Sequence, residues 1–247
     1  MAETVVIESR FHGPPRSANG GYACGLAAKS LGQPAATVRL HLPPPLNTAL
    51  EVERSADEVA LVGPDGIVVS ATAGVPTVAA PSAVSPSEAA ALRTDFDLDE
   101  YTNAHIFPTC FACGPARDDR DGLRLFPGDA GRDALVAWPW SPHESVGDED
   151  GLVDVAVLWA ALDCPSGMAF LVDADPGSPG MVLGTMTARV LRRAATGESL
   201  VVGGWRVASE GRRRMAGSVI WDETGDILAL AETVWILLKP EQLASMA

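Results

Sequence analysis

Residues 152–163 read LVDVAVLWAALD and belong to the most apolar stretch of the chain. Their length and apolar character predict a helix over residues 151–163 that lies against a buried surface. Strand-like segments precede and follow this helix, at residues 134–138, 181–191, 199–208, 215–221 and 226–238. One helix followed by an antiparallel meander predicts a sheet wrapped around that helix.

The first half of the chain repeats this order of elements. A strand-like run at residues 4–9 leads into a helix of small residues that begins near Asn19. Extended segments follow, at residues 37–42, 49–54, 58–62 and 67–73. In both halves the last two segments are joined by a glycine-containing turn, which favours a hairpin. The repeated pattern predicts an α+β protein made of two similar units.

A break in periodicity separates the two units. Residues 75–87 read VPTVAAPSAVSPS, where three prolines and several small residues interrupt helical and strand patterns. We therefore expect an N-terminal domain at residues 1–78, a linker at residues 79–105 and a C-terminal domain at residues 106–247. A chain of 247 residues fits two domains, because single domains most often contain about 100–150 residues.

The charge of the chain argues against nucleic acid as a partner. The formal net charge is −14 at pH 7, whereas nucleic-acid binders draw most of their affinity from clustered Lys and Arg. The one basic run, Arg212-Arg213-Arg214, lies just before an apolar segment. Such a run is typical of a solvated strand end, and the alternative is a docking point for an anionic cofactor tail.

The sequence also indicates in which cellular compartment the protein is found. Residues 1–8 show no basic segment followed by an apolar stretch, so they do not resemble a secretory signal. The most apolar segment is interrupted by Asp154, Asp163 and Pro165, which are costly in a bilayer. Four cysteines are too few for a disulfide scaffold of this length and fit a reducing compartment. We expect a cytoplasmic protein with no membrane partner and no cofactor.

Short motifs in the second half point to a family. Residues 110–115, CFACGP, followed by GLRL at residues 122–125, resemble the opening of hotdog-fold thioesterases of the phenylacetyl-CoA thioesterase type. Residues 152–163 resemble the long helix of that family, which begins with a His-Gly-Gly tripeptide and ends with an acidic residue. Asp163 matches the catalytic carboxylate of the family.

The first half resembles the N-terminal domain of double-hotdog acyl-CoA thioesterases, through FHGPP at residues 11–15 and NGGYACGLAA at residues 19–28. Asn19-Gly20-Gly21 matches the His-Gly-Gly tripeptide with Asn in place of His. This resemblance implies a double hotdog, in which two sheets join edge to edge and the two long helices lie close together. A further homodimer is a possible assembly.

The two halves depart from the family pattern in complementary ways. In the first half the position of the catalytic carboxylate is Ala28, and in the second half the tripeptide positions are Asp154, Val155 and Ala156. The first half keeps the glycine pair and lacks the carboxylate, whereas the second half keeps the carboxylate and lacks the glycine pair. In the family the glycine amide and the carboxylate of one site come from facing subunits, so the resemblance implies one composite site between the two halves of this chain.

The chemistry of thioester cleavage suits these residues. Cleavage places negative charge on the carbonyl oxygen. The unpaired N–H groups at the start of a helix can stabilise this charge by donating hydrogen bonds to the oxygen. Asn19 is a favourable N-cap, and Gly20 and Gly21 let a carbonyl approach the backbone. Asp163 can attack directly or deprotonate a water. The expected substrate-binding residues are His12, Tyr22, Trp159, Arg212 and Arg213.

The sequence thus predicts a thioester hydrolase that acts on an acyl-CoA or a related acyl thioester. The alternative is a non-catalytic acyl-binding module, in which Asn19-Gly20-Gly21 is only a helix start and Asp163 only a helix-terminal carboxylate. A dehydratase of the same fold is a weaker third candidate, because no histidine follows Gly151 to work with the acid.

The pair Cys110-x-x-Cys113 supplies half of a structural zinc site. The sequence has no second pair at ligand spacing, so Cys164, Cys24 or His105 could complete such a site only if the fold brought one of them near. A buried packing turn is therefore the favoured interpretation, and we expect no metal. Cys164 has no histidine near it in sequence that would activate it as a nucleophile.

Overall fold

The computed structural model describes residues 3–94, 97–132, 134–171, 180–239 and 241–242. The first half contains one long helix and a set of strands: β1 (Thr4–Val6), α1 (Gly20–Leu31), β2 (Ala35–Leu40), β3 (Ala49–Arg54), β4 (Glu58–Gly63) and β5 (Gly66–Ala73). A short 3-10 turn, η1 (Ser9–Phe11), leads toward α1. These elements follow the order that the sequence predicts, and the bounds of β3 are those predicted.

The second half repeats the arrangement. Its elements are β6 (Gly128–Asp129), β7 (Leu135–Trp140), the 3-10 turn η2 (Glu144–Val146), α4 (Val155–Met168), β8 (Met181–Val190), β9 (Leu200–Glu210), β10 (Arg213–Asp222) and β11 (Ile227–Leu237). Two further helices, α2 (Pro86–Thr94) and α3 (Leu98–Ala104), lie in the stretch expected to be a linker.

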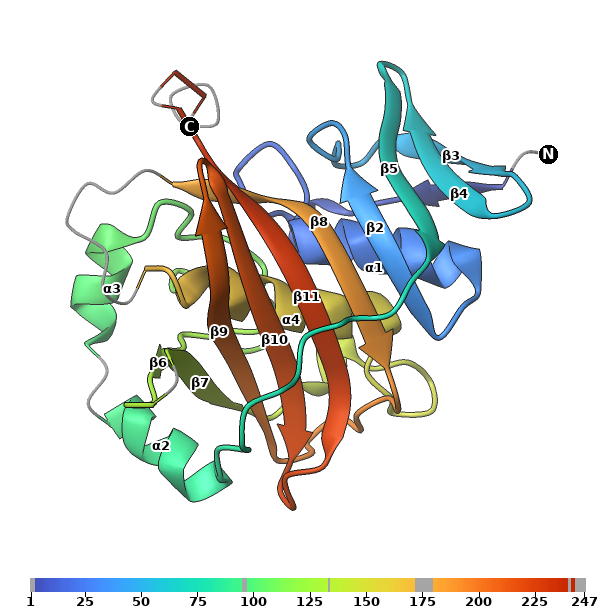
Figure 1. Cartoon of the computed structure of the whole chain (residues 1–247). Helices are drawn as coiled ribbons and strands as arrows, with labels where there is room; N and C mark the ends of the chain where they lie inside the picture. Colours follow the sequence, from blue (N-terminus) through green and yellow to red (C-terminus); the bar gives the residue numbers. More distant parts are fainter. Residues whose placement is uncertain (1–2, 95–96, 133, 172–179, 240, 243–247) are drawn as a thin grey trace.

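All strands of the described residues join one antiparallel sheet, in the order β1-β3-β4-β5-β2-β8-β11-β10-β9-β7-β6 (Figure 1). The halves meet where β2 pairs with β8, and Thr37 opposite Thr187 is the middle pair of this seam. The two hydroxyl oxygens lie 2.9 Å apart. Each half thus covers a sheet edge of the other, which otherwise would expose unpaired backbone groups. The predicted double hotdog with sheets joined edge to edge is confirmed.

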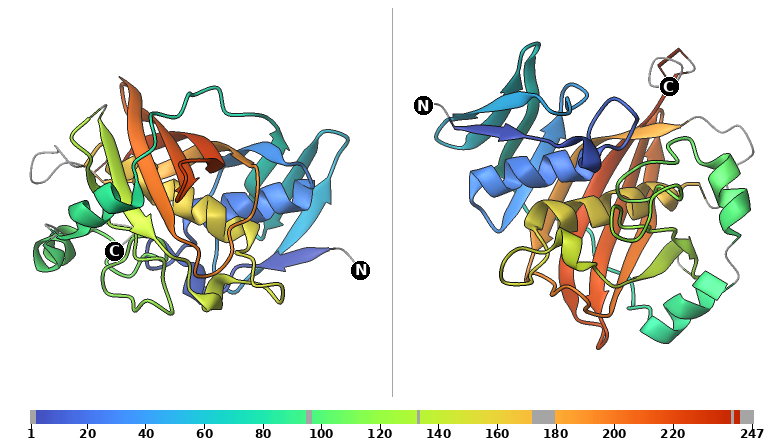
Figure 2. Two further views of the ribbon diagram at one scale, coloured as in Figure 1. Left: turned by 90° about the horizontal axis from the view of Figure 1, so that it is seen from below. Right: turned by 180° about the vertical axis from the view of Figure 1, so that it is seen from behind.

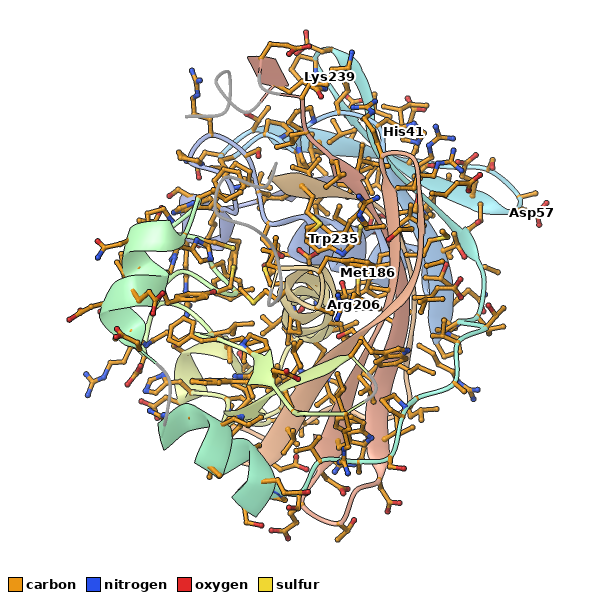
Figure 3. The ribbon with its side chains drawn as sticks, turned by 60° about the vertical axis from the view of Figure 1, so that its left-hand side comes forward. His41, Asp57, Met186, Arg206, Trp235 and Lys239 are labelled. Atoms are coloured by element: carbon orange, nitrogen blue, oxygen red, sulfur yellow. The ribbon has the colours of Figure 1, made fainter. Side chains whose placement is uncertain are left out.

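The helices α1 and α4 lie side by side on the same face of this sheet (Figure 2). One hydrophobic core runs through both halves and includes Val38 and Leu50 from the first and Leu158 and Ile220 from the second. Figure 3 shows Met186 and Trp235 beside α4, where the Trp235 Nε1 donates a hydrogen bond to the Ser166 Oγ at 2.8 Å. Burial of this shared core couples the two units.

The end of α4 differs from the prediction. We expected the helix to end at Asp163, because the residue before a proline disfavours helical backbone and Pro165 lacks an N–H. The helix instead continues through Pro165 to Met168. Every residue of α4 after Val155 is buried, and a Cβ on Gly204 of β9 would collide with the Pro165 carbonyl. Burial of the last turn against the sheet outweighs the loss of one backbone hydrogen bond.

The chain between β5 and α2 crosses the outer face of the sheet (Figure 1). The Thr77 N–H donates a hydrogen bond to Glu232 of β11. Val84 and Ala89 pack with Trp221 in a second hydrophobic cluster. The connection is therefore packed on the C-terminal half, and the exact domain boundary stays a prediction. Within the described residues no helix is long and apolar enough to cross a membrane.

Two glycines of α1 allow the close approach of the helices. A Cβ on Gly25 would stand 2.5 Å from the Cα of Ala156, and a Cβ on Gly21 would stand 2.5 Å from the Cβ of Asp163. Both distances are shorter than non-bonded carbon atoms tolerate. The spacing of four residues puts both glycines on one face of α1.

Gly25→Ala is expected to destabilise the fold by about 1–3 kcal/mol, the usual cost of overpacking a dense core. Alanine normally stabilises a helix interior relative to glycine by about 0.5–1 kcal/mol. A decrease in the free energy of unfolding would therefore show that the added methyl group collides with α4. Denaturant unfolding measures this change. Ser30→Ala in the same helix is the control and should leave the stability almost unchanged. A more stable Gly25→Ala protein would contradict the close packing of α1 on α4.

Candidate active site at the junction of the two long helices

The start of α1 presents backbone N–H groups that the helix itself cannot bond. Asn19 caps this end, since its Oδ1 accepts a hydrogen bond from the Tyr22 N–H at 2.9 Å and its carbonyl accepts one from Ala23. The Gly21 N–H donates to a carboxylate oxygen of Asp163, also at 2.9 Å. Within the described residues the Gly20 N–H is the one donor of this turn without a partner.

Asp163 reaches the start of α1 from the other half of the chain. Its Oδ2 accepts hydrogen bonds from the Gly21 N–H and from the Asn19 Nδ2, the latter at 3.0 Å. Its Oδ1 is buried and has no hydrogen-bond partner among the described residues. The structure therefore brings together Asn19, Gly21 and Asp163, which the sequence predicted would meet. Their catalytic roles stay a prediction.

The electrostatics of Asp163 are set by its burial. The residue is 1% exposed, and loss of water raises the pKa of its carboxyl to about 7. The hydrogen bonds from Gly21 and Asn19 act in the opposite direction, because they favour the charged form. The positive end of the α1 macrodipole also faces this carboxylate. A carboxyl group in this setting has the properties of a base that exchanges protons near neutral pH.

The other end of the helix pair lacks such a site. Asp154 is the N-cap of α4, and its Oδ1 accepts a hydrogen bond from the Ala156 N–H. Its Oδ2 lies 2.7 Å from the Lys29 Nζ, in an ion pair that is partly exposed to solvent. Ala28, the counterpart of Asp163, offers no carboxylate. The described residues therefore form one pairing of acid and glycine amide.

The residues predicted to bind substrate fall into two places. Tyr22 is half-buried and stacks on Phe11, with ring centroids 3.9 Å apart. His12 lies in the segment before α1, and its carbonyl accepts a hydrogen bond from the Phe111 N–H. Trp159 is almost fully buried, and its carbonyl faces Gly21, so it packs the two helices together.

Arg212 and Arg213 lie apart from this group, at the exposed turn between β9 and β10. The Arg212 Nη1 donates a hydrogen bond to the carbonyl of Leu237 on β11. Within the described residues no hydrogen bond or ion pair joins either arginine to Asn19, Gly21 or Asp163. Their predicted role in substrate binding stays untested.

The fold brings three thiols together beside this site, an arrangement that the sequence analysis named but did not favour. Cys110, Cys113 and Cys164 are buried, and their sulfur atoms all lie within 4.8 Å of one another. The Asn19 Nδ2 lies 3.9 Å from the sulfurs of Cys110 and Cys164, so one amide faces both the thiols and the carboxylate. The signal in the sequence was a Cys-x-x-Cys pair together with a cysteine directly after the proposed catalytic aspartate.

No protein-family model matches the sequence, and no curated protein matches it. Solved structures match it across almost its whole length. A candidate thioesterase from Novosphingobium aromaticivorans is 17% identical, with a TM-score of 0.59 over 96% of this chain and 95% of that one. The tesB protein of Mycobacterium avium subspecies paratuberculosis is 13% identical, with a TM-score of 0.59 over 96% of this chain and 92% of that one.

A conserved protein of unknown function with a hot dog fold, from Alicyclobacillus acidocaldarius, is 14% identical. Its TM-score is 0.56 over 96% of this chain and 93% of that one. At these identities the similarity establishes architecture and leaves activity open. Together with the continuous sheet and the paired helices, it shows that this chain has the double-hotdog fold.

Proposed function

We propose that this protein hydrolyses an acyl-CoA or a related acyl thioester at one composite site between its two halves. The observation that carries the proposal is the position of Asp163. A buried carboxylate from α4 meets the N-terminus of α1, where two hydrogen bonds hold one of its oxygens. The other oxygen has no partner among the residues that the structure describes. Buried carboxyls with perturbed environments at helix ends are typical of catalytic sites.

The Gly20 N–H is the proposed donor to the substrate carbonyl. The sequence suggested both glycine amides for this task, but the Gly21 N–H already donates to Asp163. As far as the described part of the chain shows, Gly20 offers the remaining unpaired N–H of the first turn, together with the positive end of the helix dipole. As the carbonyl oxygen gains charge in the transition state, this donor stabilises it without moving. The Gly21 N–H instead positions the Asp163 carboxylate.

Asp163 Oδ1 is the proposed reactive oxygen. It takes a proton from a water, whose oxygen then forms a bond to the carbonyl carbon. The carbon–sulfur bond breaks, and the thiolate leaves and receives the proton, which gives a carboxylic acid and a free thiol. Direct attack by Oδ1 on the carbonyl carbon is the alternative route through the same atom.

The basic turn at Arg212 and Arg213 supports CoA as the leaving group. Both side chains are exposed, in a chain whose net charge is −14. Phosphate groups of a CoA tail are the anions that clustered guanidinium groups bind well. The acyl thioester would lie at the helix junction while the nucleotide end extends toward this turn.

A non-catalytic acyl-binding protein is the second candidate. The observation that favours it is the engagement of Asp163 with Gly21 and Asn19 together with an exposure of 1%, because a carboxylate in this state also serves to join two helices. In that case Asp163 contributes to folding and has no effect on the fate of a thioester.

Asp163→Asn separates the two candidates. The amide oxygen can accept the same two hydrogen bonds, so the thermal midpoint should stay the same or rise as a buried charge is removed. If Asp163 is the base, thioester hydrolysis should fall about 10²–10⁴-fold. Release of free thiol from a panel of short, aromatic and medium-chain acyl-CoAs measures the activity.

The matched control for this experiment is Asp154→Asn, which makes the same change at the N-cap of α4, at the opposite end of the helix from the proposed site. Asparagine is an equally good N-cap, so both stability and hydrolysis should remain close to those of the unchanged protein. Full activity of Asp163→Asn on a confirmed substrate would refute the catalytic role of this carboxylate.

The double substitution Arg212→Ala with Arg213→Ala tests the leaving group. It should raise KM for an acyl-CoA about 2- to 10-fold, as expected for the loss of two exposed ionic contacts. The kcat/KM for the matching acyl-pantetheine, which lacks the nucleotide, should stay unchanged. Equal losses on both substrates would show that these arginines do not contact the nucleotide.

A further inference from the structure

The three-thiol cluster joins parts of the chain that are far apart in sequence. Cys110 and Cys113 lie in the loop before β6, whereas Cys164 lies on α4 next to Asp163. All three thiols are buried and free. The fourth cysteine, Cys24 on α1, is equally buried but does not belong to the group.

The sulfurs lie close enough together to act as ligands of one metal ion. The Cys110 and Cys164 sulfurs lie 3.9 Å apart, and all three lie within 4.8 Å of one another. Thiolates bound tetrahedrally to zinc at about 2.3 Å stand about 3.8 Å from each other. A disulfide requires a sulfur–sulfur distance of about 2.05 Å and would leave one of the three thiols unpaired.

Backbone contacts fix the loop that carries the first two thiols. The Gly114 N–H donates to the Cys110 carbonyl at 2.8 Å, and a Cβ on Gly114 would stand 2.5 Å from the Cys110 nitrogen and oxygen. Glycine is therefore required for this tight turn. The Phe111 N–H donates to the His12 carbonyl at 2.7 Å, which anchors the loop beside α1.

We propose that Cys110, Cys113 and Cys164 bind one zinc ion. Soft thiolate ligands in tetrahedral geometry select zinc among the common divalent metals. Among the described residues no further Cys, His, Asp or Glu joins the group, so a water completes the coordination. Asn19 supplies the outer shell, because its Nδ2 lies 3.9 Å from two of the sulfurs and the N–H that is not bonded to Asp163 can donate one N–H···S hydrogen bond.

His105 is excluded as the fourth ligand by its hydrogen bond. Its Nδ1 accepts from the Phe107 N–H at 3.1 Å, so the proton of the neutral ring is on Nε2. Zinc binding through Nε2 would move that proton to Nδ1, where it would face the Phe107 N–H. The zinc ion would thus link the loop to α4 through three thiolates.

The test uses the full-length protein, purified with zinc in the medium and a phosphine reductant throughout. Elemental analysis should find about one zinc per chain, and cobalt exchange should give the intense charge-transfer absorption of cobalt–thiolate bonds. Reduced, chelator-treated protein should take up one zinc in competition with a metal indicator. Absence of zinc together with failure of the reduced protein to bind it overturns the proposal, and copper at one equivalent overturns the choice of metal.

Alanine substitutions of all four cysteines provide the matched comparison. Cys110→Ala, Cys113→Ala and Cys164→Ala should each lower the zinc affinity more than about 100-fold, beyond the usual cost of an outer-shell change. Cys24→Ala removes an equally buried thiol outside the group and should retain the ion. Equal zinc content in all four variants contradicts the site. If a ligand variant does not fold, the stoichiometry and the cobalt spectrum of the unchanged protein still decide the matter.

Discussion

The contact between Asp163 and the start of α1 constrains much of this structure. A buried carboxylate is costly unless its oxygens find donors, and two of the nearest donors belong to the other half of the chain. The bond to the Gly21 N–H requires the helix axes to approach closely, which glycine makes possible. Because the helices lie together on one face, the sheets beneath them can join at β2 and β8. The hydrogen bonds of Asp163 and the pairing of β2 with β8 therefore stabilise the same arrangement of the two halves.

Much of the fold could be predicted from the sequence because its signals are local. Hairpin turns with glycine and runs of β-rich residues located most strands to within a few residues, and the repeat of the pattern indicated two units. The end of α4 could not be found in this way. Pro165 is a helix-ending signal, and only the sheet packed on that turn overrides it. Likewise, α2 and α3 lie within residues 79–105, which were expected to form a linker because of the prolines and small residues at 75–87.

The candidate site was also predicted only in part, because local sequence signals do not show contacts between distant segments. The resemblance to known motifs indicated Asn19, Gly21 and Asp163, but it did not reveal that the Gly21 amide is already bonded to the carboxylate. Nor could spacing along the chain place Cys164 beside Cys110, since 54 residues separate them. Both facts depend on the register between α1, α4 and the loop at residues 110–114. That register is set by side-chain packing between distant segments, which periodicity does not encode.

The seam at Thr37 and Thr187 has a consequence for how the protein can change over generations. In a dimer of identical subunits, each mutation of the gene alters both copies of a site at once. Here the two halves are encoded separately within one chain, so a mutation alters one half only. The glycine amides belong to one helix and the acid to the other, while the opposite end of the helix pair holds the ion pair between Lys29 and Asp154. Two halves that belong to one chain can therefore carry different residues at equivalent positions and take different roles.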